Sequence, residues 1–468
     1  MLDLDGLSRR YEVLAGELLK IVREGKRLLV VTHIDADGLA SGAMAFAALR
    51  RQGADVVLRT VPDLDRRAIA ELKEQEYDFY LLTDLGSSLV SDLEDAFDGR
   101  FLLIDHHQLG EKDVGRPEVV NAWQYGMDGG KDACSSSMAS MFARAFGEVD
   151  DLSYLAVVGA LADRQDVGEG RSLVGLNRVA LELAQKAGLV RVSKDLLFSG
   201  RETRPVHEAI ALTSSPFLPG VSGSKDAVLA ALLQAGVVLR EQGRWRAISE
   251  LTQEEKMKIM EVVASLISAG GGATDALASL VGDVYSLELE DRFTPLRDAR
   301  EFGTLLNACG RMGESGIGLA LCLGDRGEAL KAALRILADY RLSLSKALDG
   351  VLAQATRVEE HGGVVLIRGA GLIDEKLLGP VASILTSSLR FKDKVIVAMT
   401  DSGEGQLKIS CRLGDSYSGS ANLGIVMKEA ADAVNGVGGG HGSAAGAKIP
   451  SMQAEPFTKL VLEKMVAP

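Results

Sequence analysis

The sequence lacks the features that mark several large protein classes. Its 468 residues include four cysteines and no Cys-x-x-Cys pair, so we expect buried thiols in a reducing compartment rather than a disulfide framework or zinc site. No apolar run reaches the roughly 20 residues of a membrane-spanning helix. Residues 1–27 are amphipathic and contain acids, which predicts a helix and not a signal peptide. We therefore expect a cytoplasmic protein with no membrane partner.

An excess of positive charge is also absent. The net charge is −13 and the pI is about 5.1, which argues against a protein that coats nucleic acid nonspecifically. Residues 1–163 contain 17 basic and 29 acidic side chains, whereas the rest of the chain contains 35 and 36. The acidity therefore belongs almost entirely to the first third of the chain.

Residues 27–121 alternate apolar runs with helical patterns. The runs predict strands at 27–33, 54–60, 78–84, 100–105 and 117–123. Helices are predicted between them at 38–52, from a cap at Asp63 to about 75, and at 89–97. This alternation predicts an α/β fold in which helices cover both faces of a parallel sheet.

The remaining chain contains helical and mixed segments and no internal repeat. Residues 135–188 are predicted to be helical, and a long amphipathic helix at 325–360 is predicted to connect two domains. A second α/β unit follows, with strands at 362–369, 394–400 and 406–412 and helices at 375–389 and 420–435. The length and this organisation predict more than one domain.

Acidic and histidine residues follow three of the predicted strands. His33, Asp35 and Asp37 follow the first, Asp84 ends the third, and Asp105-His106-His107 ends the fourth. The carboxyl ends of parallel strands share one edge, where ligands bind. A single Asp in such a place commonly caps the next helix. Three strands that end in this way favour a metal or catalytic site.

A further acid, Asp163, ends an apolar helical segment. A carboxylate there is costly to bury unless it is paired or binds a metal, and the alternative is a helix-terminal acid that faces water. Mixed carboxylate and imidazole ligands suit Mn²⁺ or Mg²⁺. So many carboxylates fit two ions about 3.5–4 Å apart with one bridging carboxylate, as in phosphatases and nucleases.

A glycine cluster near the C-terminus offers a second candidate site. The amides of Gly438, Gly439 and Gly440 can approach an anion closely, and His441 can add a donor, although a flexible linker is the alternative. Arg412 offers a guanidinium for bidentate binding of phosphate. Several arginines and aromatics could contact a single strand, because arginine beside an aromatic ring suits base stacking. The alternative is that they are solvated surface arginines and core aromatics. These residues are Arg201, Arg204, Arg240, Arg244, Trp245, Arg246 and Arg390-Phe391-Lys392.

The ordered motifs resemble those of the DHH phosphoesterase superfamily. Its four N-terminal motifs are similar to His33-x-Asp35-x-Asp37-Gly38, Asp84, Asp105-His106-His107 and Asp163, and the GGGH signature of its C-terminal domain is similar to Gly438–Gly442. The first motif and the long middle segment are most similar to archaeal RecJ-like proteins of the GINS-associated nuclease type. In several DHH families the first histidine lies where this chain has Val31, so His33 is either a ligand or a neighbour of the ligands.

The resemblance implies a fold and an activity. We expect a DHH catalytic lobe at 1–190, an inserted segment for a partner or strand at 191–324, a helical connector at 325–360, and a smaller α/β substrate-binding lobe at 361–468 across a cleft. We expect a hydrolase of ester bonds: an exonuclease for single-stranded DNA or RNA, linked to DNA replication and repair. A GINS replisome subunit is the implied protein partner.

The resemblance also implies roles for the candidate residues. Two divalent ions, preferably Mn²⁺ and alternatively Mg²⁺, are expected on His33, Asp35, Asp37, Asp84, His106 and Asp163, with Asp84 as the bridge. Asp105 is expected to ligate or to orient His106. His107 is expected to contact the phosphate, which is also bound by Arg412, Gly438, Gly439, Gly440 and His441.

Two other functions stay open at this stage. One is a DHH phosphodiesterase for small substrates such as nanoRNA, cyclic dinucleotides or phosphoadenosine phosphate, although the resemblance implies a shorter chain for those families. The other is a catalytically silent replisome scaffold, against which the presence of every motif acid argues.

Overall fold

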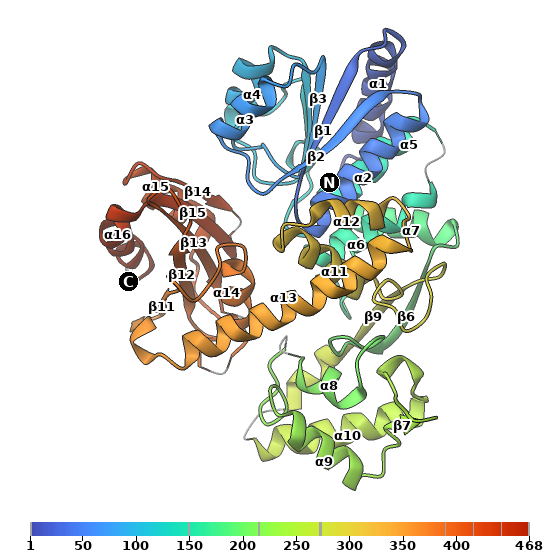
Figure 1. Cartoon of the computed structure of the whole chain (residues 1–468), viewed down its shortest axis with the longest axis vertical. Coiled ribbons are helices and arrows are strands. Elements are labelled where there is room, and N and C mark those ends of the chain that lie inside the picture. The colour runs from blue at the N-terminus through green and yellow to red at the C-terminus, as the bar shows by residue number, and fades with distance from the viewer. Residues whose placement is uncertain are drawn as a thin grey trace. The chain divides into compact units, whose positions relative to one another are not determined.

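A computed structural model describes residues 2–147, 150–213, 216–270, 274–388, 390–414, 416–440 and 442–466. The chain forms two compact units, whose elements are labelled in Figure 1. The first contains Met1–Thr203 and Val281–Leu337, and the second contains Arg204–Leu280 and Ala338–Pro468. The sequence therefore leaves the first unit and later returns to it.

A five-stranded parallel sheet with the order β2-β1-β3-β4-β5 forms the centre of the first unit. Its strands are β1 (Arg27–His33), β2 (Asp55–Val61), β3 (Phe79–Thr83), β4 (Phe101–Asp105) and β5 (Val119–Asn121). Successive side chains point to opposite faces. Leu28 and Val30 accordingly join one core, and Leu29 and Val31 join the other. Two buried faces explain why the inner strands β1, β3 and β4 consist mostly of apolar residues.

Helices cover both faces of this sheet, which confirms the predicted α/β fold. Figure 1 shows α3 and α4 on one side and α1 and α5 on the other. The helices are α1 (Leu4–Arg23), α2 (Ala36–Arg51), α3 (Arg66–Lys73), α4 (Val90–Phe97), α5 (Ser135–Arg144), α6 (Tyr154–Ala162) and α7 (Gly175–Lys186). The predicted cap Asp63 is wrong, because Asp65 caps α3 by accepting the amide of Ala68.

The first unit also contains the segments that come before and after residues 204–280. The strands β6 (Val190–Leu196) and β9 (Val281–Leu287) pair antiparallel, and α11 (Ala299–Arg311) and α12 (Ser315–Cys322) follow. Both helices pack against α2, which carries part of the first motif. The predicted segment 191–324 thus contributes residues 191–203 and 281–324 to the first unit.

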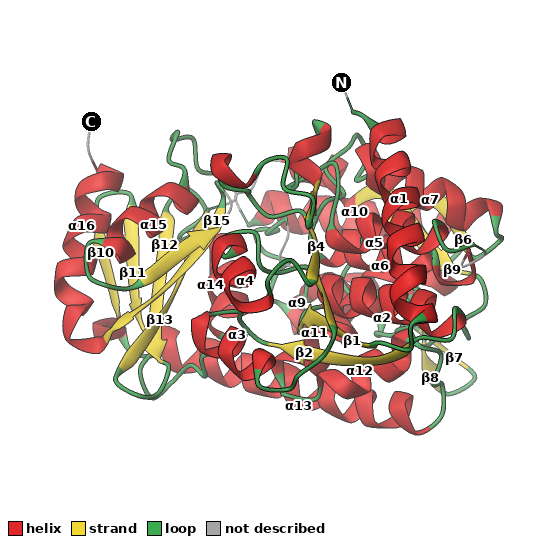
Figure 2. Cartoon of the chain, turned by 90° about the horizontal axis from the view of Figure 1, so that it is seen from above, coloured by secondary structure: helices red, strands yellow, loops and turns green. Residues whose placement is uncertain are grey.

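The second unit contains a mixed sheet with the order β10-β11-β12-β13-β15-β14. Its strands are β10 (Val358–His361), β11 (Val364–Arg368), β12 (Val395–Asp401), β13 (Gln406–Leu413), β14 (Val437–Gly440) and β15 (Ala444–Pro450). Its helices are α14 (Leu378–Thr386), α15 (Leu423–Asp432) and α16 (Ala454–Val466). Figure 2 shows α14 on the opposite side of this sheet from α16. This region confirms the predicted second α/β unit.

Residues 204–280 of the second unit form short helices and a hairpin. These elements are α8 (Val206–Ala211), α9 (Lys225–Gln234), β7 (Arg240–Glu241), β8 (Arg244–Trp245) and α10 (Gln253–Ala269). The predicted connecting helix is shorter than 325–360, because α13 spans Glu328–Leu352. Residues 358–361 instead pair with β11 through a turn at Gly362, whose φ is +59°.

The cysteines agree with the prediction that they are buried thiols. All four cysteines are free and buried, as expected of core thiols. Among the helices within the described ranges, none is both long and apolar enough to cross a bilayer.

Candidate metal centre

The carboxyl ends of β1, β3 and β4 reach the same edge of the first sheet. Thr83 of β3 is in register with Thr32 of β1 and with Ile104 of β4. The next residue of each strand therefore arrives at the same level. These residues are His33, Asp84 and Asp105.

One group of possible ligands lies at the end of β1. His33 Nδ1 is 3.0 Å from Asp35 Oδ2 and 3.6 Å from Asp84 Oδ2. The other ring nitrogen, Nε2, lies 3.2 Å from the Pro62 carbonyl and donates to it when Nδ1 is the bare nitrogen. Asp35 caps α2 by accepting the Gly38 amide at 3.0 Å. His33, Asp35 and Asp84 can therefore hold a cation together.

A second group surrounds His106. Its Nε2 lies 3.8 Å from Asp37 Oδ2, and its Nδ1 lies 3.9 Å from Asp163 Oδ2. Nδ1 is also 2.6 Å from the Gly129 carbonyl, to which it donates a hydrogen bond. This bond leaves the lone pair on Nε2 and fixes the ring, as is usual for metal-binding histidines. Asp37, His106 and Asp163 can thus hold a cation together.

Asp84 lies between the two groups. Its Oδ1 is 3.3 Å from His106 Nε2, while its Oδ2 is the atom nearest His33. Oδ2 is buried and accepts no hydrogen bond from any described residue. A buried carboxylate oxygen without a donor is costly, and a bound cation would remove that cost. Asp84 also has a φ of +65°, a backbone conformation that few non-glycine residues adopt.

The first turn of α5 positions Asp37. Its two carboxylate oxygens accept the amides of Ser135 at 2.8 Å and Ser136 at 2.9 Å. These amides have no partner within their own helix, and the helix dipole favours an anion there. Burial nevertheless raises the pKa of Asp37 to about 7, and the neighbouring Asp84 contributes to this shift.

Asp105 differs from its neighbours because protein donors saturate it. Oδ2 accepts the Ser87 amide at 3.2 Å and the Ser87 hydroxyl at 2.7 Å. Oδ1 accepts the amides of His106 and His107 and the His107 ring Nδ1 at 2.8 Å. Burial opposes ionisation, but His107 outweighs it and lowers the pKa of Asp105. Asp105 therefore orients the ring of His107, whereas the ring of His106 bonds to Gly129. Ligand atoms of Asp105, Asp84, His106 and His107 also lie close together, so the alternative that Asp105 is a metal ligand stays a prediction.

The electrostatics of the centre favour added positive charge. Burial lowers the pKa of His106, but Asp84, Asp163 and Asp37 outweigh burial and raise it well above its usual value. Burial and Asp84 raise the pKa of Asp163. Without cations the cluster therefore retains protons that metal ions would displace. The donor set and the bare oxygen of Asp84 fit divalent cations.

Several residues that hold this centre together were missed by sequence analysis. Gln165 donates to Asp163 Oδ2 at 2.7 Å and to the Gly129 carbonyl at 2.9 Å. Asn307 of α11 accepts the Ala36 amide at 3.0 Å. The serine run at the start of α5 was a usable signal, because serine is common where a helix begins. Nothing local pointed to Asn307, which lies 271 residues from its partner.

In the second unit, Arg412 already makes contacts within the protein. Its Nη1 donates to the carbonyls of Cys411 at 2.8 Å and Ala445 at 3.1 Å, and its Nε donates to Ser383 Oγ at 3.3 Å. Part of the guanidinium therefore stabilises the sheet. His441 lies outside the described residues.

The three neighbouring glycines form the edge strand β14, for which no strand was predicted. A Cβ at Gly438 would lie 2.4 Å from the Met427 carbonyl oxygen, and one at Gly440 would lie 2.6 Å from that of Ala444. A Cβ at Gly439 would meet no atom within 4 Å. Packing therefore requires the outer two glycines and leaves space at the middle one.

The arginines of the middle segment are largely engaged with the protein itself. Trp245 lies between the Arg240 guanidinium, 4.1 Å from its ring centre, and the His207 ring at 4.7 Å. Arg246 forms a two-pronged ion pair with Glu255 at 2.6 and 2.9 Å. These contacts favour the alternative interpretation, in which the arginines are solvated and the aromatics pack within the protein. They do not favour the interpretation that Trp245 offers a free surface for stacking a base.

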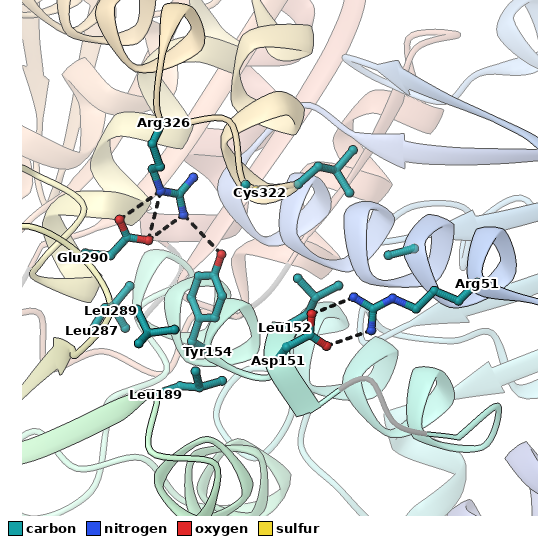
Figure 3. A pocket seen from close by; sticks show the side chains of 13 residues that line it. Arg51, Asp151, Leu152, Tyr154, Leu189, Leu287, Leu289, Glu290, Cys322 and Arg326 are labelled. Atoms are coloured by element: carbon teal, nitrogen blue, oxygen red, sulfur yellow. Dashed lines mark hydrogen bonds and ion pairs between the residues drawn. The ribbon is translucent and has the colours of Figure 1, made fainter.

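A pocket of about 390 Å³ in the first unit is lined by none of the predicted site residues (Figure 3). Arg51 pairs with Asp151 at 2.6 and 2.7 Å. Arg326 bonds to Glu290 and to the Tyr154 hydroxyl, the latter at 3.4 Å. The charged groups that line this pocket pair with one another, so we do not place the chemistry there.

Comparison with known proteins identifies the domains. Family models match the DHH family N-terminal domain at residues 27–160, the DHH-CID domain at 197–281 and the DHHA1 domain at 364–467. An uncharacterized protein of Methanocaldococcus jannaschii is 27% identical over 452 residues, which cover 95% of this chain and 94% of the relative.

Solved structures share the fold. CDC45 from Entamoeba histolytica aligns with a TM-score of 0.66 and 12% identity, over 98% of this chain and 99% of that one. RecJ from Thermus thermophilus in complex with Mn²⁺ aligns with a TM-score of 0.59 and 18% identity, over 98% of this chain and 55% of that one. The chain therefore belongs to the DHH phosphoesterase superfamily and has the RecJ-like fold.

Proposed function

We propose that this phosphoesterase is a single-strand-specific exonuclease that hydrolyses the phosphodiester bonds of DNA or RNA with two divalent cations. Asp84 carries the proposal, because its bare buried oxygen lies between two groups of possible ligands. We assign one cation to His33, Asp35 and Asp84, and the other to Asp37, Asp84, His106 and Asp163. RecJ structures that contain Mn²⁺ or Mg²⁺ support these ions, of which we propose Mn²⁺ as the preferred one.

The remaining residues act on the substrate or on one another. Such cations, when bound, supply the Lewis acidity that activates water and neutralises the phosphoryl oxygens. Asp105 accepts Nδ1–H of His107 and outweighs burial to raise the pKa of that ring, so a protonated His107 can donate Nε2–H to a substrate phosphate. Gln165 holds Asp163, and Asn307 holds the backbone beside Asp35. These bonds preorganise the acids before substrate binds.

We assign substrate binding to the DHHA1 domain. Arg412, the glycines 438–440 and His441 are the residues proposed to contact the substrate phosphate. From the resemblance of the sequence motifs to RecJ-like proteins of the GINS-associated type, we also propose a cytoplasmic role in DNA replication and repair, with GINS as a protein partner. The test for the C-terminal residues is His441→Ala, which should lower hydrolysis while bound Mn²⁺, measured by atomic emission, stays unchanged. Loss of bound Mn²⁺ in this variant would make His441 a ligand instead.

The decisive assay compares substrates with Mn²⁺ present. A 30-mer of single-stranded DNA or RNA, labelled at either end, should be shortened stepwise, and the matching duplex should resist. Asp84→Ala should abolish shortening, while strand binding, measured by fluorescence anisotropy, survives. Faster cleavage of a 5-mer than of the 30-mer would favour a small-substrate phosphodiesterase. No cleavage of either would favour a silent scaffold.

A further inference from the structure

An exposed tryptophan lies beside the metal centre and has no role in the chemistry proposed above. Trp123 belongs to the short 3-10 helix Ala122–Tyr125, and 42% of its surface is exposed. Its indole Nε1 donates to the His106 carbonyl at 3.1 Å. One edge of the ring is thus fixed to the Asp-His-His motif, while much of the ring contacts solvent.

A buried polar network connects Trp123 to His107. Asn121 accepts the Trp123 amide at 3.0 Å, and its side-chain nitrogen donates to the His107 carbonyl at 2.9 Å. The same nitrogen donates to Ser87 Oγ at 2.9 Å, and Ser87 in turn donates to Asp105. Asn121 is fully buried and Ser87 is 2% exposed. One rigid network therefore positions both exposed groups, the imidazole of His107 and the indole of Trp123.

We propose that Trp123 is the stacking platform for the nucleobase of the nucleotide whose phosphate lies at the metal centre. This inference rests on the proposed function. The imidazole and the indole match the two parts of a nucleotide, because one binds a phosphate and the other a flat ring. Every base has a π face, so such stacking gives affinity without sequence preference. It also suits a lobe whose acidic charge repels the phosphate backbone.

Tryptophan fluorescence tests the contact directly. The chain contains two tryptophans, so the full-length variant Trp245→Phe retains Trp123 as its single indole. Stopped-flow mixing of this variant with the single strand (dT)10 should quench its fluorescence before hydrolysis proceeds. The variant Trp123→Phe, which retains Trp245, should show little quenching. Binding of the strand by anisotropy without quenching of Trp123 would overturn the proposal.

A substrate change separates stacking from a structural role. The wild type should cut a strand with an intact terminal base about 10-fold or more faster, in kcat/KM, than one whose terminal nucleotide is abasic, as expected for base–aromatic stacking. Trp123→Ala should reduce this ratio to below about 2-fold, whereas Trp123→Phe should retain most of it. Phe293→Ala is the matched control, since Phe293 is 44% exposed elsewhere in the unit.

Two outcomes of this assay count against the proposal. Equal loss of the ratio in the Ala and Phe variants would assign the effect to the bond between the indole nitrogen and His106, and a wild-type ratio near 1 would exclude base stacking. If the wild type cuts neither strand, the proposed function fails, and the fluorescence experiment still decides whether Trp123 binds a base.

Discussion

Asp84 and Asp105 lie at the ends of neighbouring parallel strands, and both are buried, yet they differ in the hydrogen bonds that they accept. Asp105 accepts five hydrogen bonds, from Ser87, His106 and His107. Asp84 Oδ2 accepts none from the residues that the structure describes. A buried carboxylate that protein donors saturate contributes to the fold, whereas one left bare weakens it unless a cation binds. The contrast therefore favours Asp84 as a cation ligand and Asp105 as a positioning acid, in two neighbouring sequence motifs.

A similar contrast occurs among the glycines of β14. Packing against the Met427 carbonyl explains the absence of a side chain at Gly438, while the space beside Gly439 is open. The fold accounts for the first glycine and not for the second. In both regions, a feature that the fold does not use is the better candidate for contact with a ligand.

The largest effect is expected from Asp84→Ala. It should lower kcat on a single-stranded 30-mer by roughly 10³-fold or more, beyond the 10- to 100-fold that loss of an outer partner of a metal site costs. Mn²⁺ affinity by calorimetry should fall as well. Urea unfolding in EDTA should show a smaller loss of stability than Asp105→Asn causes, because only Oδ1 of Asp84, 3.3 Å from His106 Nε2, has a polar partner while Oδ2 has none. Retained turnover with Mn²⁺ would contradict the two-cation assignment.

Asp105→Asn should differ from Asp84→Ala by causing a large loss of folding stability. The new amide group faces hydrogen-bond donors on both sides, so at least one of them loses its acceptor. We expect a loss of about 3 kcal/mol in the free energy of unfolding, the scale for breaking a buried charged pair. Urea unfolding in EDTA measures it, with Asp55→Asn at a surface ion pair as the control. Unfolding equal to that of the wild type would remove the distinction between the two acids.

The glycine pair extends the comparison to the second unit. Gly438→Ala should cost about 1–3 kcal/mol of stability, as overpacking does. Gly439→Ala should change stability by less than about 0.5 kcal/mol, as at an ordinary surface site, while kcat/KM on single strands falls if substrate approaches that backbone. Unfolding curves and hydrolysis rates of the two variants check this. Unchanged hydrolysis in a stable Gly439→Ala would exclude Gly439 from the substrate site.

The sequence was sufficient for the strands and for the gathering of acids and histidines at their ends, because each is a local pattern. Alternating apolar runs predicted the parallel sheet, and acids at the ends of β1, β3 and β4 predicted the cluster that forms there. The roles within Asp105-His106-His107 needed coordinates, since the direction of each side chain depends on Ser87 and Gly129. Asn307 shows the wider limit. Its contact with Ala36 joins parts of the chain that the sequence had placed in different segments.

Glu301 tests, with the smallest expected effect, whether hydrogen-bond donors keep a buried carboxylate ionised. It is buried and has donors, but it lies outside the sequence motifs. It accepts the Glu202 amide at 2.7 Å and the Thr203 hydroxyl at 2.5 Å. Burial, with repulsion from Asp298, nevertheless raises the pKa of Glu301 to about 7. The native state therefore retains a proton that the unfolded chain releases near pH 4.5.

The sign of the resulting pH dependence follows from this proton. Its contribution to stability is complete below about pH 4.5 and is lost as the pH rises towards 7, at a rate of at most about 1.4 kcal/mol per pH unit. Urea unfolding between pH 5 and 8 should show a steeper decline for the wild type than for Glu301→Gln. Equal slopes would mean that the two donors suffice to keep Glu301 ionised. Hydrogen-bond donors would then be enough to keep a buried carboxylate ionised, as they are at Asp105. Asp84 Oδ2, which has no such donor, would be distinguished from both carboxylates as the candidate ligand of a cation.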